Sequence, residues 1–446
     1  MSTIEKNNSP RPNGLALVPF LVFAVFYVGL SLLAKYHYQA DMPFYAVPMP
    51  IAFLVASAAA LFLGRKSLTE KIDTYAAGMG DTNIMIMCLI FILAGAFATV
   101  AKQMGAVDAA VAIAQAVIPA RLMLAGIFLV SCLISLSIGT SCGTIAALTP
   151  IAAGLVGPMG ISPALMLGAV VGGSMFGDNL SMISDTTIAA TRTQGIGMRE
   201  KFLANIRIAL PAALVAFAVY CVLGKAAALG DTPVITGKHI VLVIPYIVVL
   251  GLAVAGMNVM LLLFLGTVLA AIIGNVYGAF NFLESLQAMG AGSLGMAETL
   301  FVALLAGGLL GTIRENGGIA WLIQRIEAST RGVRGCEFGV LLLVAAVNLF
   351  TANNTVAIVI AGPIAKDLSD RFGCLPRRIA SILDTTSCVI QGLIPYGAQI
   401  LIAIGLAKGA GLEVSPLGLI GALYYPFLLA VAVLASIVIG GGRRTK

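Results

Sequence analysis

Two segments of this apolar chain place an aspartate directly before a pair of threonines. The first, SMISDTTIAA, contains Asp185 and Thr186, and the second, ASILDTTSCV, contains Asp384 and Thr385. A carboxylate inside a membrane is costly and is typically retained to handle an ion or a proton. Hydroxyl and carbonyl oxygens beside it can complete the shell of a cation such as sodium. These four residues are therefore candidates for an ion-binding site.

A third acid, Asp178, precedes the first segment in FGDNLSMISDTT. If this stretch is one helix, Asp178 and Asp185 lie about 10 Å apart on nearly one face, with Ser181 between them. Such a row could pass sodium or a proton along a path. The alternative is that each aspartate caps a short helix and has a purely structural role.

Hydroxyl and amide groups interrupt two further apolar runs. The run SIGTSCGT supplies four hydroxyl groups, from Ser137, Thr140, Ser141 and Thr144. The run FTANNT supplies Asn353, Asn354 and Thr355. Small hydroxyl residues also favour close helix packing, so the first run is open to a structural explanation. Adjacent asparagines in apolar sequence are costly unless they are satisfied, and they could bind an ion or hold a carboxylate.

The composition identifies the class of protein that carries these groups. Of the 446 residues, 60% are hydrophobic and 10% are charged, with a net charge of +7. This is the composition of an all-α polytopic membrane protein. The seven cysteines have unrelated spacings and there are two histidines, so we expect no disulfide framework, no metal site and no zinc-dependent enzyme. The positive charge indicates membrane topology rather than nucleic-acid binding.

Apolar stretches must position the candidate groups. They predict spans near residues 14–34, 44–64, 83–101, 121–157, 160–177, 202–224, 239–255, 257–277, 295–313, 337–366, 376–408 and 416–440. The spans at 121–157, 337–366 and 376–408 each contain a break. Because backbone groups must be satisfied in hydrocarbon, a helix breaks only where it is buried in protein or lines a wet cavity.

Charge between the spans predicts the orientation. Basic residues near the N-terminus, after the second span and at the C-terminus place these three regions in the cytoplasm. Residues 65–81 are expected to form a cytoplasmic connector, and residues 319–329 an interfacial amphipathic helix. Residues 1–13 are polar and are predicted to be a disordered cytoplasmic tail.

The two halves of the chain resemble each other in order. Residues 94–105 align with 306–317, Thr144 pairs with Thr355, and Asp185 pairs with Asp384, at offsets of 212, 211 and 199 residues. Three matches in one order indicate an internal duplication, with repeats at residues 14–230 and 231–446. Repeated membrane proteins with broken spans are typically secondary transporters that bind their substrate where the breaks meet.

The string GTSCGT, followed by GGSMFGDNLSMISDTT and later by DTTSCVIQGLIPYGAQ, resembles the signature of the NhaC-type sodium/proton antiporter family. Cys142 and Met182 stand where many members have tryptophan and proline. The resemblance extends to the wider ion transporter superfamily. It implies inverted repeats with helical hairpins, elevator-type alternating access, a homodimer and a place in the prokaryotic plasma (inner) membrane.

Two functions follow from these residues and this resemblance. In the first, a sodium ion and a proton compete for one carboxylate, and this competition couples their fluxes; Asp185 is the leading candidate, with Asp178 and Asp384 beside it. In the second, sodium or a proton drives the carriage of a small organic solute, an amino acid or a dicarboxylate, held by Asn353 and Asn354. The apolar spans contain few cationic side chains, which favours the inorganic ion. Neither function requires a cofactor, an enzymatic activity or nucleic acid.

Overall fold

The computed structural model describes residues 10–39, 47–63, 66–182, 184–224, 235–255 and 257–439. Helices are the regular elements throughout these ranges, which confirms the prediction of an all-α protein. Nine helical segments within them are long and apolar enough to cross a membrane. The chain is therefore a polytopic membrane protein.

The helices of the first half follow the predicted spans closely. They are η2 (Gly14–Leu17), α1 (Val18–Tyr36), α3 (Met49–Phe62), α4 (Leu68–Met79), α5 (Thr82–Gln103), α6 (Ala106–Val117), η3 (Ala120–Leu122), α7 (Met123–Ile138), α8 (Ser141–Met159), α9 (Pro163–Leu180), α10 (Asp185–Gln194) and α11 (Met198–Leu223). The predicted break in the span at 121–157 separates α7 from α8.

The helices of the second half are interrupted at the other two predicted breaks, in the spans 337–366 and 376–408. They are α12 (Gly237–Val254), α13 (Val259–Val276), α14 (Phe282–Gly295), α15 (Ala297–Glu315), α16 (Gly318–Ser329), α17 (Gly332–Thr351), α18 (Asn354–Phe372), α19 (Pro376–Leu393), α20 (Ala398–Gly409), α21 (Pro416–Gly421) and α22 (Tyr424–Ile439). Breaks therefore separate α17 from α18 and α19 from α20.

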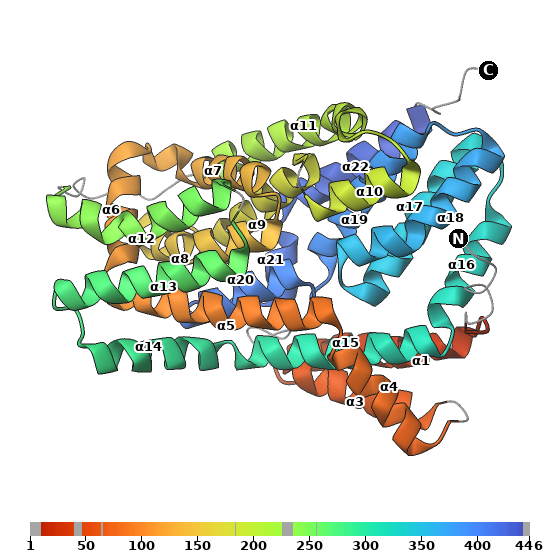
Figure 1. The fold of residues 1–446 in the computed structure, drawn as a ribbon, viewed down its shortest axis with the longest axis horizontal. Coiled ribbons are helices and arrows are strands. Elements are labelled where there is room, and N and C mark those ends of the chain that lie inside the picture. Colours follow the sequence, from red (N-terminus) through yellow and green to blue (C-terminus); the bar gives the residue numbers. More distant parts are fainter. Residues whose placement is uncertain are drawn as a thin grey trace.

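The helices form two groups with the broken elements between them (Figure 1). Along one edge, α15 packs against α3 and α4, and α14 packs against α5. Along the other edge, α11 packs against α22, which also contacts α19. The half-helix α20 contacts both α5 and α8, so it lies between the two groups.

Several elements of the two halves have matching lengths. Both α8 and α18 contain 19 residues, and both α9 and α19 contain 18. The 12-residue helices α6 and α16 each follow a left-handed glycine, Gly105 with φ 86° and Gly317 with φ 84°. These two glycines are the ones that the sequence alignment pairs.

The structure adds detail to two predictions about the ends and loops. The expected connector contains α4, whose capping box joins Ser67 and Glu70. This helix packs so closely on α15 that a Cβ on Gly78 would lie 2.6 Å from the Gly307 carbonyl oxygen. The predicted disordered tail is ordered at its end, since the Asn13 amide donates to the Gly317 carbonyl at 3.1 Å. Residues 1–9 lie outside the described residues.

Candidate functional site

Two helix breaks, one in each half of the chain, have nearly the same backbone conformation. Helix α7 ends at Gly139 in the left-handed region (φ 75°), and Thr140 is extended before α8 begins. Helix α17 ends at Ala352, which is also left-handed (φ 48°), and Asn353 is extended before α18 begins. A non-glycine residue rarely adopts this conformation, so the surrounding structure must hold Ala352 in it.

These breaks meet at a central cavity of about 430 Å³. It is lined from the α7/α8 break, the α9/α10 break, the α17/α18 break and the start of α20, and also by the first turns of α5 and α13. The predicted site residues that line it are Thr140, Ser141, Asp178, Asp185, Thr186, Asn353, Asn354 and Thr355. The structure thus brings together groups from both halves of the chain.

Asp178 is the buried carboxylate of this cavity, with 8% of its surface exposed. The Ser141 hydroxyl donates to its Oδ2 at 2.9 Å, and the Ser184 hydroxyl donates to its Oδ1 at 2.6 Å. Ser184 is the N-cap residue of α10 but makes no capping bond with its side chain. Its hydroxyl therefore serves the carboxylate instead of the helix end.

Glutamines extend this hydrogen-bond network into the second half. Gln399 Nε2 donates to the Ser141 hydroxyl at 3.0 Å, and Gln391 Nε2 donates to Gln399 Oε1 at 2.9 Å. The Oε1 atom of Gln391 is buried and has no hydrogen-bond partner in the part of the chain that the structure describes. An unpaired buried oxygen is costly, so the network retains unused acceptor capacity beside the cavity.

Asp384 lies away from the cavity lining and is paired with a lysine. Its Oδ2 is 2.6 Å from Lys201 Nζ, and each of these side chains is 1% exposed. Asn205 and Asn179 also donate to this oxygen, at 2.7 and 3.1 Å. The carboxylate of Asp384 is therefore already neutralised by a buried cation.

Asp185 has a different environment from the other two acids. It is the first residue of α10 and is exposed at the cavity. Its negative charge at a helix N-terminus is favoured by the helix dipole, and water can solvate it. The break between Leu180 and Asp185 shows that Asp178 and Asp185 do not lie on one continuous helix, as one of the two sequence interpretations assumed.

The remaining predicted residues lie outside the cavity lining. Ser137 bonds to the Leu133 carbonyl within its own helix, and Thr144 bonds to the Thr140 carbonyl. Ser181 is buried at the end of α9, and Thr385 is buried beside Asp384 in α19. Asp384 and Thr385 lie within α19 rather than at a break, so the two Asp-Thr-Thr segments do not occupy equivalent positions.

The sequence interpretation missed a cationic residue. Lys201 is buried in the first turn of α11, one residue before the predicted span at 202–224 begins. The inference that cationic side chains are scarce at depth is therefore wrong at this position. A signal was present, since Lys201 and Asn205 are four residues apart and must share a helix face. Ser184, Gln391 and Gln399 carried no comparable pattern.

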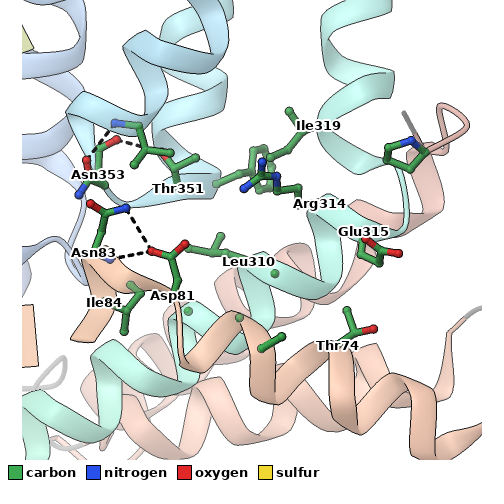
Figure 2. Close-up of a pocket in the computed structure, with 17 residues that line it drawn as sticks. Thr74, Asp81, Asn83, Ile84, Leu310, Arg314, Glu315, Ile319, Thr351 and Asn353 are labelled. Carbon is green, nitrogen blue, oxygen red and sulfur yellow. Dashed lines mark hydrogen bonds between the residues drawn. The ribbon is translucent and has the colours of Figure 1, made fainter. Parts of the chain in front are cut away.

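A second cavity, the vestibule, adjoins the first (Figure 2). It measures about 550 Å³, and Asn83, Ile84 and Asn353 line both cavities. The Asn83 side chain points toward Asp81 (Figure 2). Asp81 Oδ1 accepts hydrogen bonds from the backbone nitrogen and the side-chain nitrogen of Asn83. Because the cavities share these lining residues, the vestibule, which lies at the ends of α4 and α15, is a direct neighbour of the central site.

Comparisons with known proteins identify the family of this chain. The chain is 26% identical to the Na⁺/H⁺ antiporter NhaC of Bacillus subtilis, over 88% of this chain and 91% of that protein. It is 23% identical to the malate-2H⁺/Na⁺-lactate antiporter of the same organism, over 84% and 86%. It is also 23% identical to the arginine/ornithine antiporter ArcD of Halobacterium salinarum, over 60% and 62%. A family model described as the Na⁺/H⁺ antiporter family matches residues 45–225 and again 226–440. Both halves of the chain fit that model, so this protein belongs to the Na⁺/H⁺ antiporter family.

Proposed function

We propose that this protein is a secondary active transporter that exchanges sodium for protons at the central cavity. One observation carries the proposal: Asp178 is a buried carboxylate in the cavity wall, and its hydrogen-bond donors are hydroxyl groups. Among the described residues, no lysine or arginine lies within ion-pair distance of it. A buried charge without a partner must be neutralised, and a proton or a sodium ion can do this.

Competition for this one carboxylate would couple the two fluxes. When sodium is bound, its shell would draw on the hydroxyl oxygens of Ser141 and Ser184, which bond to Asp178, and of Thr186, which bonds to Ser184. When a proton is bound, the carboxyl group is neutral and the sodium must leave. Asp178 therefore replaces Asp185 as our leading candidate, because Asp185 is exposed and can keep its charge in water.

Alternating access would supply the movement. We propose that residues 14–230 and 231–446 are two inverted repeats and that the mobile part moves as an elevator within a homodimer. The matched lengths of α8 and α18 and of α9 and α19 support the repeats. Lys66 and Glu315 form an ion pair at the end where the vestibule opens, and the basic residues there support a cytoplasmic orientation in the inner membrane.

A second candidate function is exchange of a small organic acid or amino acid. Asn353 and Asn354 use their side-chain oxygens to accept backbone N–H groups, which leaves their NH₂ groups as donors at the cavity. The start of α18 adds a positive helix end there. A cavity of about 430 Å³ is large enough for such a solute. The names of the malate/lactate and arginine/ornithine relatives favour the same class.

Transport by purified protein in liposomes separates these functions. With a pH-sensitive dye inside, we expect a sodium pulse to move protons and a potassium or choline pulse to move none. Uptake of labelled amino acids or dicarboxylates, dependent on sodium or on a proton gradient, would instead establish the second function. The proposal involves no catalytic activity and no organic cofactor, since sodium and protons are themselves the transported species. Equal proton movement with potassium would contradict the specific sodium site.

A further inference from the structure

The contacts of Lys201 are those of a bound cation. Its ammonium nitrogen lies 2.6 Å from Asp384 Oδ2, 2.7 Å from the Asn179 carbonyl oxygen and 2.6 Å from Thr187 Oγ1. A carboxylate, a carbonyl and a hydroxyl are the groups that hold sodium at a helix break. The nitrogen thus occupies an oxygen-lined place that a small monovalent cation could fill.

The surroundings of this place have further oxygens that make no hydrogen bond. Asp384 Oδ1 and Asn205 Oδ1 are both buried without a partner among the described residues. The two side chains already bond to each other through other atoms, since Asn205 Nδ2 donates to Asp384 Oδ2. The cluster therefore holds more acceptor oxygens than one ammonium group can satisfy.

The buried cluster contains one more acidic group than basic groups. It contains two carboxylates, Asp178 and Asp384, and one ammonium group, Lys201, all nearly inaccessible to water. Asn179 follows Asp178 directly and donates to Asp384 at 3.1 Å, so the two acids belong to one connected cluster. One negative charge remains after the ion pair forms, and burial in low dielectric makes a second unbalanced charge costly.

We propose that Lys201 is a tethered cation that permanently fills a second cation site at Asp384, so that the chain binds its exchangeable ion at Asp178 alone. The inference rests on the proposed function for the choice of sodium as the probe and for Asp178 as the site of the exchangeable ion. The side chain cannot leave its site, so Asp384 cannot take part in exchange. Lys201 thereby limits each chain to one mobile monovalent cation.

The test counts sodium bound by purified protein in equilibrium dialysis with radioactive sodium. Lys201→Met keeps most of the side-chain length but removes the ammonium group, and we expect it to bind one equivalent more than the parent chain. Lys201→Met combined with Asp384→Asn should lose that extra equivalent. Lys408→Met is the matched control: Lys408 also forms a 2.6 Å ion pair, with Glu298, but both side chains are 48% exposed. It should bind no additional sodium.

The outcomes distinguish this inference from the proposed function. The parent chain's own sodium binding tests the proposed function, whereas the increment caused by Lys201→Met tests the tethered cation. A folded Lys201→Met protein with no increment would overturn the inference. If the Lys201→Met protein folds only when sodium is present, the inference is supported. If it fails to fold with every cation supplied, while the double variant folds, the inference is overturned.

A variant that keeps Lys201 provides a second test of the inference. With Asp384 already filled, Asp178→Asn should lose all saturable sodium binding. Retention of a full equivalent that is lost when Asp384→Asn is added would mean that Asp384 accepts sodium in the presence of Lys201, and would overturn the inference. Retention that survives Asp384→Asn would instead contradict the assignment of the exchangeable ion to Asp178, which belongs to the proposed function.

Discussion

Asp178 and Asp384 are buried acids from the two halves of the chain, and their surroundings differ. Asp178 receives two hydroxyl donors and faces the central cavity. Asp384 receives a lysine and two asparagine amides and lies outside the cavity lining. Burial alone therefore does not mark the coupling carboxylate. What distinguishes Asp178 is that it lines the central cavity and has no ion-pair partner among the described residues.

The largest effect should come from Asp178→Asn. This substitution preserves the size of the side chain but removes the charge that alternates between sodium and a proton, so exchange should fall to the rate of liposomes without protein. Sodium-driven proton movement measures it. Asp108→Asn, which alters an exposed acid at the start of α6, should leave exchange unchanged. Near-normal exchange by Asp178→Asn would remove Asp178 from the mechanism.

Asp384→Asn should mainly affect stability. It leaves the charge of Lys201 buried without a counter-charge, which costs about 3–5 kcal/mol when one partner of a buried pair is removed. Denaturation of the detergent-solubilised protein measures the loss. Removing both charges, with Lys201→Met and Asp384→Asn together, should restore much of it. If Asp384→Asn is as stable as the parent chain, the ion pair does not have the energetic role inferred from its geometry.

Ser184→Ala tests the hydroxyl shell of Asp178. The lost bond joins a hydroxyl to a buried carboxylate at 2.6 Å, and such bonds contribute about 1.5–3 kcal/mol. We expect apparent sodium affinity to weaken by about tenfold, which corresponds to ~1.4 kcal/mol. Ser137→Ala is the control, because Ser137 bonds within its own helix and does not line the cavity. Equal effects of the two changes would argue against the shell.

Asp185→Asn should have the smallest effect on transport. The residue is exposed at the start of α10, where a negative charge contributes about 0.3–1 kcal/mol with the helix dipole. The change should therefore lower the free energy of unfolding by about 0.3–1 kcal/mol, while sodium-driven exchange keeps most of its rate and the shape of its pH dependence. Complete loss of exchange would instead return the coupling role to Asp185.

Much of the fold could be predicted because apolar length and small polar interruptions are local signals. The breaks after Gly139 and before Asn353 lie within the predicted interrupted spans, since glycine, threonine and asparagine favour turns and caps. Helix α14 was missed because its 14 residues include polar positions in the first turns, as at Glu284. Its contact with α5 is tertiary and leaves little trace in local sequence.

The site was harder to predict than the breaks. Identical Asp-Thr-Thr segments suggested equivalent positions, yet one begins α10 and the other lies within α19. A short identical string shows only that two segments share residue types. Whether the two segments are structurally equivalent depends on where each helix starts and ends. The pairing of Lys201 with Asp384 spans a long stretch of sequence and arises only from packing of α11 against α19.

The vestibule also determines how the transporter would respond to membrane voltage. The vestibule and the central cavity are neighbours that share the lining residues Asn83 and Asn353. If water fills both when an ion enters, that path would carry little of the electric field, and most of the potential would fall across the protein on the other side of Asp178. One charge crossing that side changes in energy by about 2.3 kcal/mol per 100 mV. In this conformation, ion entry from the vestibule should therefore depend weakly on voltage, and the voltage-sensitive step should be the transfer to the opposite face.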